Sequence, residues 1–144
     1  MVASNTVKPE AVFVPVSVLA LWTGVVLFLT GWSRIRAVRA GRVGRAAFRL
    51  GEAADVPSNV TVFNRNLMNL LEMPVLFYVA CISFYATRLV SPRVIGLAWI
   101  YVVLRLAHSL VHLTHNRVVP RMIVFALSNG VLLTLWISFL SRVL

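Results

Sequence analysis

The sequence predicts an all-α membrane protein, a bundle of four transmembrane helices that forms a single domain over residues 1–144. The chain is 60% hydrophobic with a mean hydropathy of +0.88, whereas soluble domains are about 45–50% apolar. Its apolar residues gather into four stretches of about 20 residues each, the length that crosses a bilayer. The basic residues concentrate between these stretches, as in multi-pass membrane proteins.

The first predicted span covers residues 11–32. Lys8 and Glu10 precede its apolar run, and an arginine series rather than a small-residue cleavage site follows it, so we expect the span to stay in the mature protein. A basic loop over residues 33–66 comes next, and its three glycines disfavour one rigid helix. A loop this long either contacts a ligand, for instance as a lid, or only sets the topology.

Three further spans are predicted over residues 67–86, 94–113 and 122–140. Seven arginines lie between the first and second spans and two between the third and fourth, against four basic residues on the opposite side. Because basic residues favour the cytoplasmic side, we expect the two richer segments in the cytoplasm and both termini outside it.

The net charge of +10 raises the question of nucleic-acid binding. Arginines interleaved with membrane spans are instead typical of the positive-inside pattern and of attraction to anionic lipid headgroups. We therefore expect the lipid bilayer, and no nucleic acid, as a partner. The one cysteine, Cys81, lies in an apolar run and has no second cysteine with which to form an intrachain disulfide.

Two of the spans carry polar side chains on one face. Near the start of the second span, spacings of four and three residues align Arg65, Asn69 and Glu72. In the third span, spacings of three and four residues align Arg105, His108 and His112. Such side chains are costly in lipid unless they face one another or a ligand, so we expect the two faces to meet in a buried pocket near the cytoplasmic side.

The residues leave three interpretations of this pocket open. In the first it is structural: Glu72 pairs with Arg105, and the Asn and His side chains hydrogen-bond between helices. In the second, His108, His112 and His115 join Glu72 on a metal ion, but the nearby arginines disfavour a cation, and we predict no metal. In the third, arginines with Asn and His donors bind the carboxylates or thiolate of an anionic ligand, and Glu72 binds its ammonium group.

These motifs resemble those of the MAPEG family (membrane-associated proteins in eicosanoid and glutathione metabolism). The stretch RNLMNLLEMPVLF at residues 65–77 is similar to the family's signature in its second span. The stretch RLAHSLVH at residues 105–112, followed by Pro120 and Arg121, is similar to the signature of the third span and the start of the fourth. The four-span layout and the long basic loop match as well.

The resemblance implies a bacterial-type, inner-membrane homotrimer that binds glutathione as co-substrate at subunit interfaces. It further implies a glutathione-dependent transferase or peroxidase that acts on a lipophilic electrophile from the bilayer. Arg121 matches the catalytic arginine, whose guanidinium would stabilise the thiolate. The positions that match glutathione contacts, or residues that shape the pocket, are Arg34, Arg65, Asn69, Glu72, Arg105 and His108.

Three positions differ from the catalytic members of the family. Eukaryotic enzymes usually have Tyr in place of His112, often a further Arg in place of Met68, and a hydroxyl residue in place of Met122. His112 is still a candidate glutathione ligand, because an imidazole can donate a hydrogen bond to sulfur or act as a base, although it can also bond between helices. The family includes non-enzymatic members, so a non-catalytic lipid- or small-molecule-binding membrane protein is the alternative.

Overall fold

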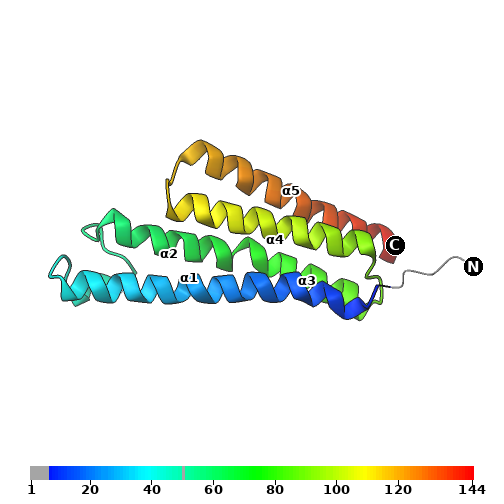
Figure 1. The fold of residues 1–144 in the computed structure, drawn as a ribbon, viewed down its shortest axis with the longest axis horizontal. Helices are drawn as coiled ribbons and strands as arrows, with labels where there is room; N and C mark the ends of the chain where they lie inside the picture. Colours follow the sequence, from blue (N-terminus) through cyan, green and yellow to red (C-terminus); the bar gives the residue numbers. More distant parts are fainter. Residues whose placement is uncertain (1–6, 50) are drawn as a thin grey trace, which may run out of the picture.

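The computed structural model describes residues 7–49 and 51–144, and it is all-helical over them (Figure 1). The α-helices are α1 (Phe13–Arg39), α2 (Ser58–Leu71), α3 (Met73–Ala86), α4 (Pro92–Leu113) and α5 (Val118–Val143). Two short 3-10 helices, Pro9–Val12 and Arg45–Phe48, precede and follow α1. With α2 and α3 taken together, the described chain holds four helical segments that are long and apolar enough to cross a membrane. The predicted fold class is therefore confirmed.

The helices extend beyond the predicted spans, so the loop after the first span is shorter than residues 33–66. α1 continues to Arg39 and ends just before Gly41, whose φ of 66° lies in the left-handed region that glycine favours. α2 begins at Ser58. Tertiary packing stabilises the extra turns, which hydropathy does not detect. A small apolar cluster at this end consists of Ala37, Val43, Val56 and Val60.

Glu72 separates α2 from α3 and marks a bend in the second span. Its backbone leaves the helical region, with φ −87° and ψ −89°. Pro74 explains the break, because it has no N–H to donate to the carbonyl of Leu70 and its ring crowds that carbonyl. The break places a carboxylate at an irregular point inside a membrane span.

A polar network links three helices through the apolar core. The hydroxyl oxygen of Ser109 in α4 accepts hydrogen bonds from Trp22 Nε1 of α1 at 2.9 Å and from Asn66 Nδ2 of α2 at 2.6 Å. Ser109 and Asn66 are both fully buried. Because hydrogen bonds between membrane helices help to fix how they pack, this network sets the position of α2 relative to α4.

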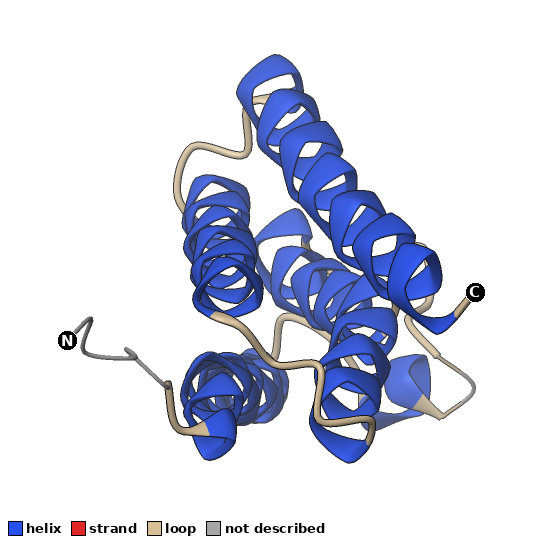
Figure 2. Cartoon of the chain, turned by 90° about the vertical axis from the view of Figure 1, so that its right-hand side faces the viewer, coloured by secondary structure: helices blue, strands red, loops and turns tan. Residues whose placement is uncertain are grey.

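The helices pack around a common core rather than in one plane, as the end view shows (Figure 2). The segment between α1 and α2 and the turn between α4 and α5 lie at the same end of the bundle, and the chain's C-terminus lies at the other (Figure 1). α4 packs against α1, α2 and α5. The core is built from residues such as Leu19, Phe77, Phe84, Tyr101 and Leu135.

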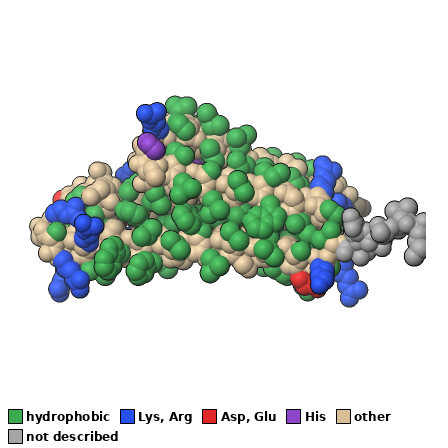
Figure 3. Space-filling view, viewed as in Figure 1, with side chains coloured by type: hydrophobic (Ala, Val, Ile, Leu, Met, Phe, Trp, Pro, Cys, Tyr) green, Lys and Arg blue, Asp and Glu red, His purple; other side chains and the backbone are tan. Residues whose placement is uncertain are grey.

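The outer surface of the bundle is apolar. Hydrophobic side chains cover much of the face in Figure 3, and Lys and Arg side chains gather toward its ends. Leu21 and Phe28 of α1 are 73% and 69% exposed. An apolar surface of this extent is far larger than water-soluble proteins expose, and it suits lipid. The chain thus has the features of a multi-pass integral membrane protein.

Candidate functional site

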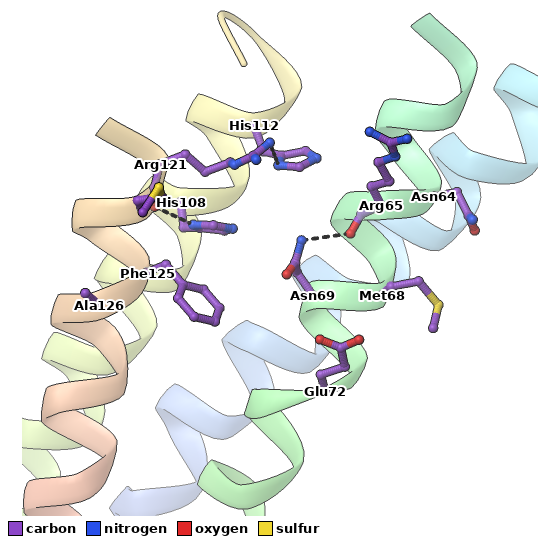
Figure 4. A pocket seen from close by; sticks show the side chains of 11 residues that line it. Asn64, Arg65, Met68, Asn69, Glu72, His108, His112, Arg121, Phe125 and Ala126 are labelled. Atoms are coloured by element: carbon purple, nitrogen blue, oxygen red, sulfur yellow. Dashed lines mark hydrogen bonds between the residues drawn. The ribbon is translucent and has the colours of Figure 1, made fainter. Parts of the chain in front are cut away.

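A cavity of about 570 Å³ opens between α2 on one side and α4 and α5 on the other (Figure 4). It lies toward the end of the bundle that carries the α4–α5 turn. Six of the eight residues predicted for the site line it, and the predicted catalytic arginine is one of them. The complete lining is Asn64, Arg65, Met68, Asn69, Glu72, His108, His112, Arg121, Met122, Phe125 and Ala126.

One wall of the cavity is formed by α2 and by the break that follows it, and it carries Arg65, Asn69 and Glu72. Asn69 donates a hydrogen bond from Nδ2 to the backbone carbonyl of Arg65, at 2.9 Å. Arg65 and Glu72 are exposed in the single chain, so both charged groups are accessible from the cavity. Glu72 is the one carboxylate that lines the cavity, and Figure 4 shows it beyond Asn69 as seen from Arg65.

The opposite wall holds Arg121 through contacts with α4 and with the α4–α5 turn. Arg121 Nη1 lies 3.1 Å from His112 Nδ1 and donates a 2.7 Å hydrogen bond to Asn116 Oδ1. The backbone carbonyl of Arg121 lies 3.2 Å from His108 Nδ1. Both protons of Nη1 are thereby used, so Nη2 and Nε remain for a ligand. The guanidinium is oriented before any ligand arrives.

Asn116 is a site residue that the sequence analysis missed. Its backbone has φ 45°, in the left-handed region, and its N–H bonds to the carbonyl of Val111 at 2.8 Å. Asparagine adopts this conformation more readily than most residues, so an Asn just after a predicted helix is a signal for such a turn. That signal predicts the turn but not the contact with Arg121.

Arg105 lies behind the cavity rather than in its lining. Only 1% of its surface is exposed, and its Nε donates to the hydroxyl of Tyr101 at 3.1 Å. The guanidinium carbon lies 5.6 Å and 5.2 Å from the ring centres of Tyr101 and Phe125. The suggested ion pair between Glu72 and Arg105 does not form, because the break at Pro74 and the packing of Arg105 between the two rings keep them apart. Arg105 instead supports Phe125, which lines the cavity.

Arg34 also lies outside the cavity of its own chain. It forms an ion pair of 3.2 Å with Glu52, and this is the one salt bridge within residues 7–49 and 51–144. Its guanidinium also lies over the ring of Phe48, 5.3 Å from the ring centre. Arg34, in α1, therefore contacts the segment that follows this helix and does not line the cavity of its own chain.

The three histidines do not converge on one point. His108 and His112 line the cavity with ring centres 6.0 Å apart, but the exposed His115 bonds to the hydroxyl of its neighbour Thr114 at 3.1 Å. The arrangement needed for the metal alternative is thus absent, and Arg65 and Arg121 make the cavity unfavourable for a cation.

The cavity combines two arginines with one carboxylate, two amides and two imidazoles. The remaining lining is apolar and consists of Met68, Met122, Phe125 and Ala126. The sequence marked the two methionines only as differences from the catalytic members of the family, and it gave no indication of a role for Phe125 or Ala126. Side chains of these kinds can bind a ligand that carries both anionic and cationic groups, next to a surface suited to an apolar molecule.

A family model described as "MAPEG family" matches residues 12–141. No curated protein and no solved structure matches the chain. The match includes most or all of each membrane-crossing segment and every residue that lines the cavity. It agrees with the motifs in α2 and α4 and with the four-span architecture, and the chain therefore belongs to the MAPEG family.

Proposed function

We propose that the protein is a membrane-embedded glutathione-dependent transferase or peroxidase that acts on a lipophilic electrophile. Membership of the family links the chain to glutathione or lipid metabolism in membranes. The observation that carries the finer proposal is the convergence of Arg65, Asn69, Glu72 and Arg121 on one cavity. Glutathione has two carboxylates, one ammonium group and one thiol, and this set of side chains offers a partner for each kind of group.

In the proposed complex, arginine and amide donors bind the carboxylates, and Glu72 binds the ammonium group. Arg121 stabilises the thiolate, because a neighbouring guanidinium favours the ionised form of a thiol. The apolar side chains of Met122, Phe125 and Ala126 receive the electrophile beside the sulfur. Arg105 contributes by supporting Phe125 rather than by touching glutathione.

Glutathione is expected to raise the unfolding temperature of the purified protein, since a ligand that binds only the folded state stabilises it. Glu72→Gln should need at least about tenfold more glutathione for the same rise, because a hydrogen bond to a charged group contributes about 1.5–3 kcal/mol. Thermal unfolding in detergent, measured over micromolar to millimolar glutathione, gives both values.

Glu10→Gln serves as the matched control, because it neutralises an exposed carboxylate outside the cavity. Its response should equal that of the wild type. If millimolar glutathione leaves the wild-type unfolding temperature unchanged, the proposal fails. A non-catalytic lipid- or small-molecule-binding role for the same cavity then becomes the leading function.

The proposed assembly is a homotrimer in which Arg34 acts on the cavity of a neighbouring subunit. Arg34 does not line the cavity of its own chain, so it can reach a bound glutathione only from another chain. Its pairing with Glu52 and its position over Phe48 hold it at the same end of the bundle as the cavity.

Co-expressed Arg34→Ala and Arg121→Ala chains are expected to regain activity that neither variant has alone. A mixed trimer is a ring that contains both chains, so about one third of its cavities combine an intact Arg121 with a neighbour that has an intact Arg34. Turnover of co-purified mixed trimers, carrying two different affinity tags, measures this recovery. Activity no higher than the mean of the two single variants would show that Arg34 does not act between subunits.

The proposed location is a bacterial inner membrane with both termini outside the cytoplasm. The arginine-rich segment after α1 and the turn that carries Arg117 lie at one end of the bundle. Basic residues favour the cytoplasmic side, so this end and the cavity near it would face the cytoplasm, where glutathione is available.

A further inference from the structure

Two buried nitrogen atoms in the cavity have no hydrogen-bond partner in the described part of the chain: Nε2 of His108 and Nε2 of His112. The two residues are only 4% and 2% exposed. The Nδ1 atom of each ring, by contrast, has a partner. The two partners differ in chemistry, so they fix different protonation patterns on the two rings.

His108 presents an acceptor to the cavity. Its Nδ1 lies 3.2 Å from the backbone carbonyl oxygen of Arg121, and a carbonyl oxygen only accepts, so Nδ1 carries the proton. A second proton on Nε2 would create a buried cation beside the guanidinium of Arg121, with no acceptor for the added N–H among the described residues. His108 is therefore neutral, and the lone pair of Nε2 is free.

His112 presents a donor to the cavity. Its Nδ1 lies 3.1 Å from Nη1 of Arg121, which is always protonated and only donates. Nδ1 of His112 must therefore accept through its lone pair, which makes the ring neutral and places its one proton on Nε2. The same side chain that orients Arg121 thus has an unused N–H (Figure 4).

We infer that this acceptor–donor pair binds the reacting thiol: Nε2 of His108 takes the thiol proton, and Nε2–H of His112 donates a hydrogen bond to the resulting thiolate. This inference rests on the proposed function. A thiol both donates and accepts, whereas the carboxylates of glutathione only accept and its ammonium group only donates. The ring centres are 6.0 Å apart, and one sulfur atom between them can bond to both rings.

The proton transfer is balanced within the site. The S–H bond breaks, its electron pair stays on sulfur, and the proton forms a new N–H bond at Nε2 of His108. Two neutral groups thus become a thiolate and an imidazolium. The thiolate is then held by Nε2–H of His112 and by the free nitrogens of Arg121. His108 is a catalytic base in this scheme, which the family resemblance did not assign to it.

Asparagine and glutamine substitutions separate the two nitrogens of each ring. The amide of Asn lies near the position of Nδ1, and that of Gln near the position of Nε2. His108→Asn therefore keeps a donor for the Arg121 carbonyl but removes the acceptor in the cavity. His112→Asn keeps an acceptor for Arg121 but removes the donor. His112→Gln is the converse control, which keeps a donor in the cavity and loses the contact with Arg121.

The first test needs no ligand. The chain has three histidines, so protein labelled with ¹⁵N-histidine gives three ring systems, which the variants assign. We expect His108 to be protonated at Nδ1 and His112 at Nε2, each neutral at pH 7. The same tautomer on both rings, or a cationic ring at either position, would overturn the inference.

The second test measures thiolate formation by ultraviolet absorbance of the glutathione complex. His108→Asn should bind glutathione in the thermal assay yet lose most of the thiolate signal and slow turnover by about 10²-fold or more, the usual contribution of a general base. An unchanged thiolate signal in His108→Asn overturns only the role of His108. No glutathione binding by the wild type instead overturns the proposed function itself, and the two failures are thereby distinguished.

Discussion

Replacing Arg121 with alanine is expected to lower glutathione-dependent turnover by about 10²–10³-fold, the loss seen when one oriented donor to a developing anion is removed. Arg121 is fixed by two contacts through Nη1, so its remaining N–H groups do not have to be ordered when the thiolate forms. Steady-state turnover with a lipophilic electrophile, together with thiolate absorbance of the glutathione complex, measures this effect.

Turnover and thiolate absorbance should both fall in Arg121→Ala. Arg117→Ala is the matched control, because it removes an exposed arginine four residues earlier that does not line the cavity, and its turnover should match the wild type. Arg121→Lys should recover part of the activity, since an ammonium keeps the charge but lacks the rigid planar fork that holds the donors of a guanidinium in fixed directions. Wild-type thiolate absorbance in Arg121→Ala would show that another group stabilises the sulfur.

When Arg105 is replaced, the loss of stability is expected to depend on the volume of the new side chain more than on its charge. Arg105 is the largest fully buried side chain, and its two terminal nitrogens have no partner among the described residues. Arg105→Ala leaves a cavity beside Tyr101 and Phe125 and removes two cation–π contacts, at a cost of about 2–5 kcal/mol. Arg105→Met fills most of this volume and removes a buried unpaired charge.

The methionine variant should therefore be about as stable as the wild type, since apolar side chains often replace buried charges without loss. Thermal or denaturant unfolding in detergent, followed by tryptophan fluorescence, compares the three proteins. Glutathione binding should persist in Arg105→Met, because Arg105 does not line the cavity. If Arg105→Met is as unstable as Arg105→Ala, the charge itself stabilises the fold, and a group from a neighbouring chain must pair with it.

The sequence predicted the main elements of the fold because the bilayer imposes a simple requirement on each span. About 20 apolar residues are needed to cross it, and four such runs are plain in this chain. Each of the four predicted spans lies within one of the long helical segments, and most of these segments extend beyond the predicted bounds. The last turns of α1 lie outside the apolar run, where Ala37 packs on Val43 and Val60. A hydropathy pattern cannot predict that contact, because it depends on how separate segments of the chain pack together.

The polar faces of α2 and α4 were also predictable, since side chains three or four residues apart share a helix face. The contacts that the side chains on these faces make were not predictable. Glu72 and Arg105 carry opposite charges, and the two faces that hold them were expected to meet. The helix break caused by Pro74 lies at Glu72, however, and the guanidinium of Arg105 packs against the rings of Tyr101 and Phe125. Pairing between helices depends on rotation and depth, which a single sequence does not specify.

The sequence by itself determined a four-span membrane protein with MAPEG motifs and a set of polar and charged residues on two of its spans. Composition and local spacing are sufficient for this, because lipid penalises any polar group that lacks a partner. Only the tertiary structure decided which residues share the cavity. It joined Arg121 to His112 and Asn116, left Arg105 behind Phe125, and gave the two histidines opposite hydrogen-bond partners. Those outcomes depend on how helices from distant parts of the chain pack against one another.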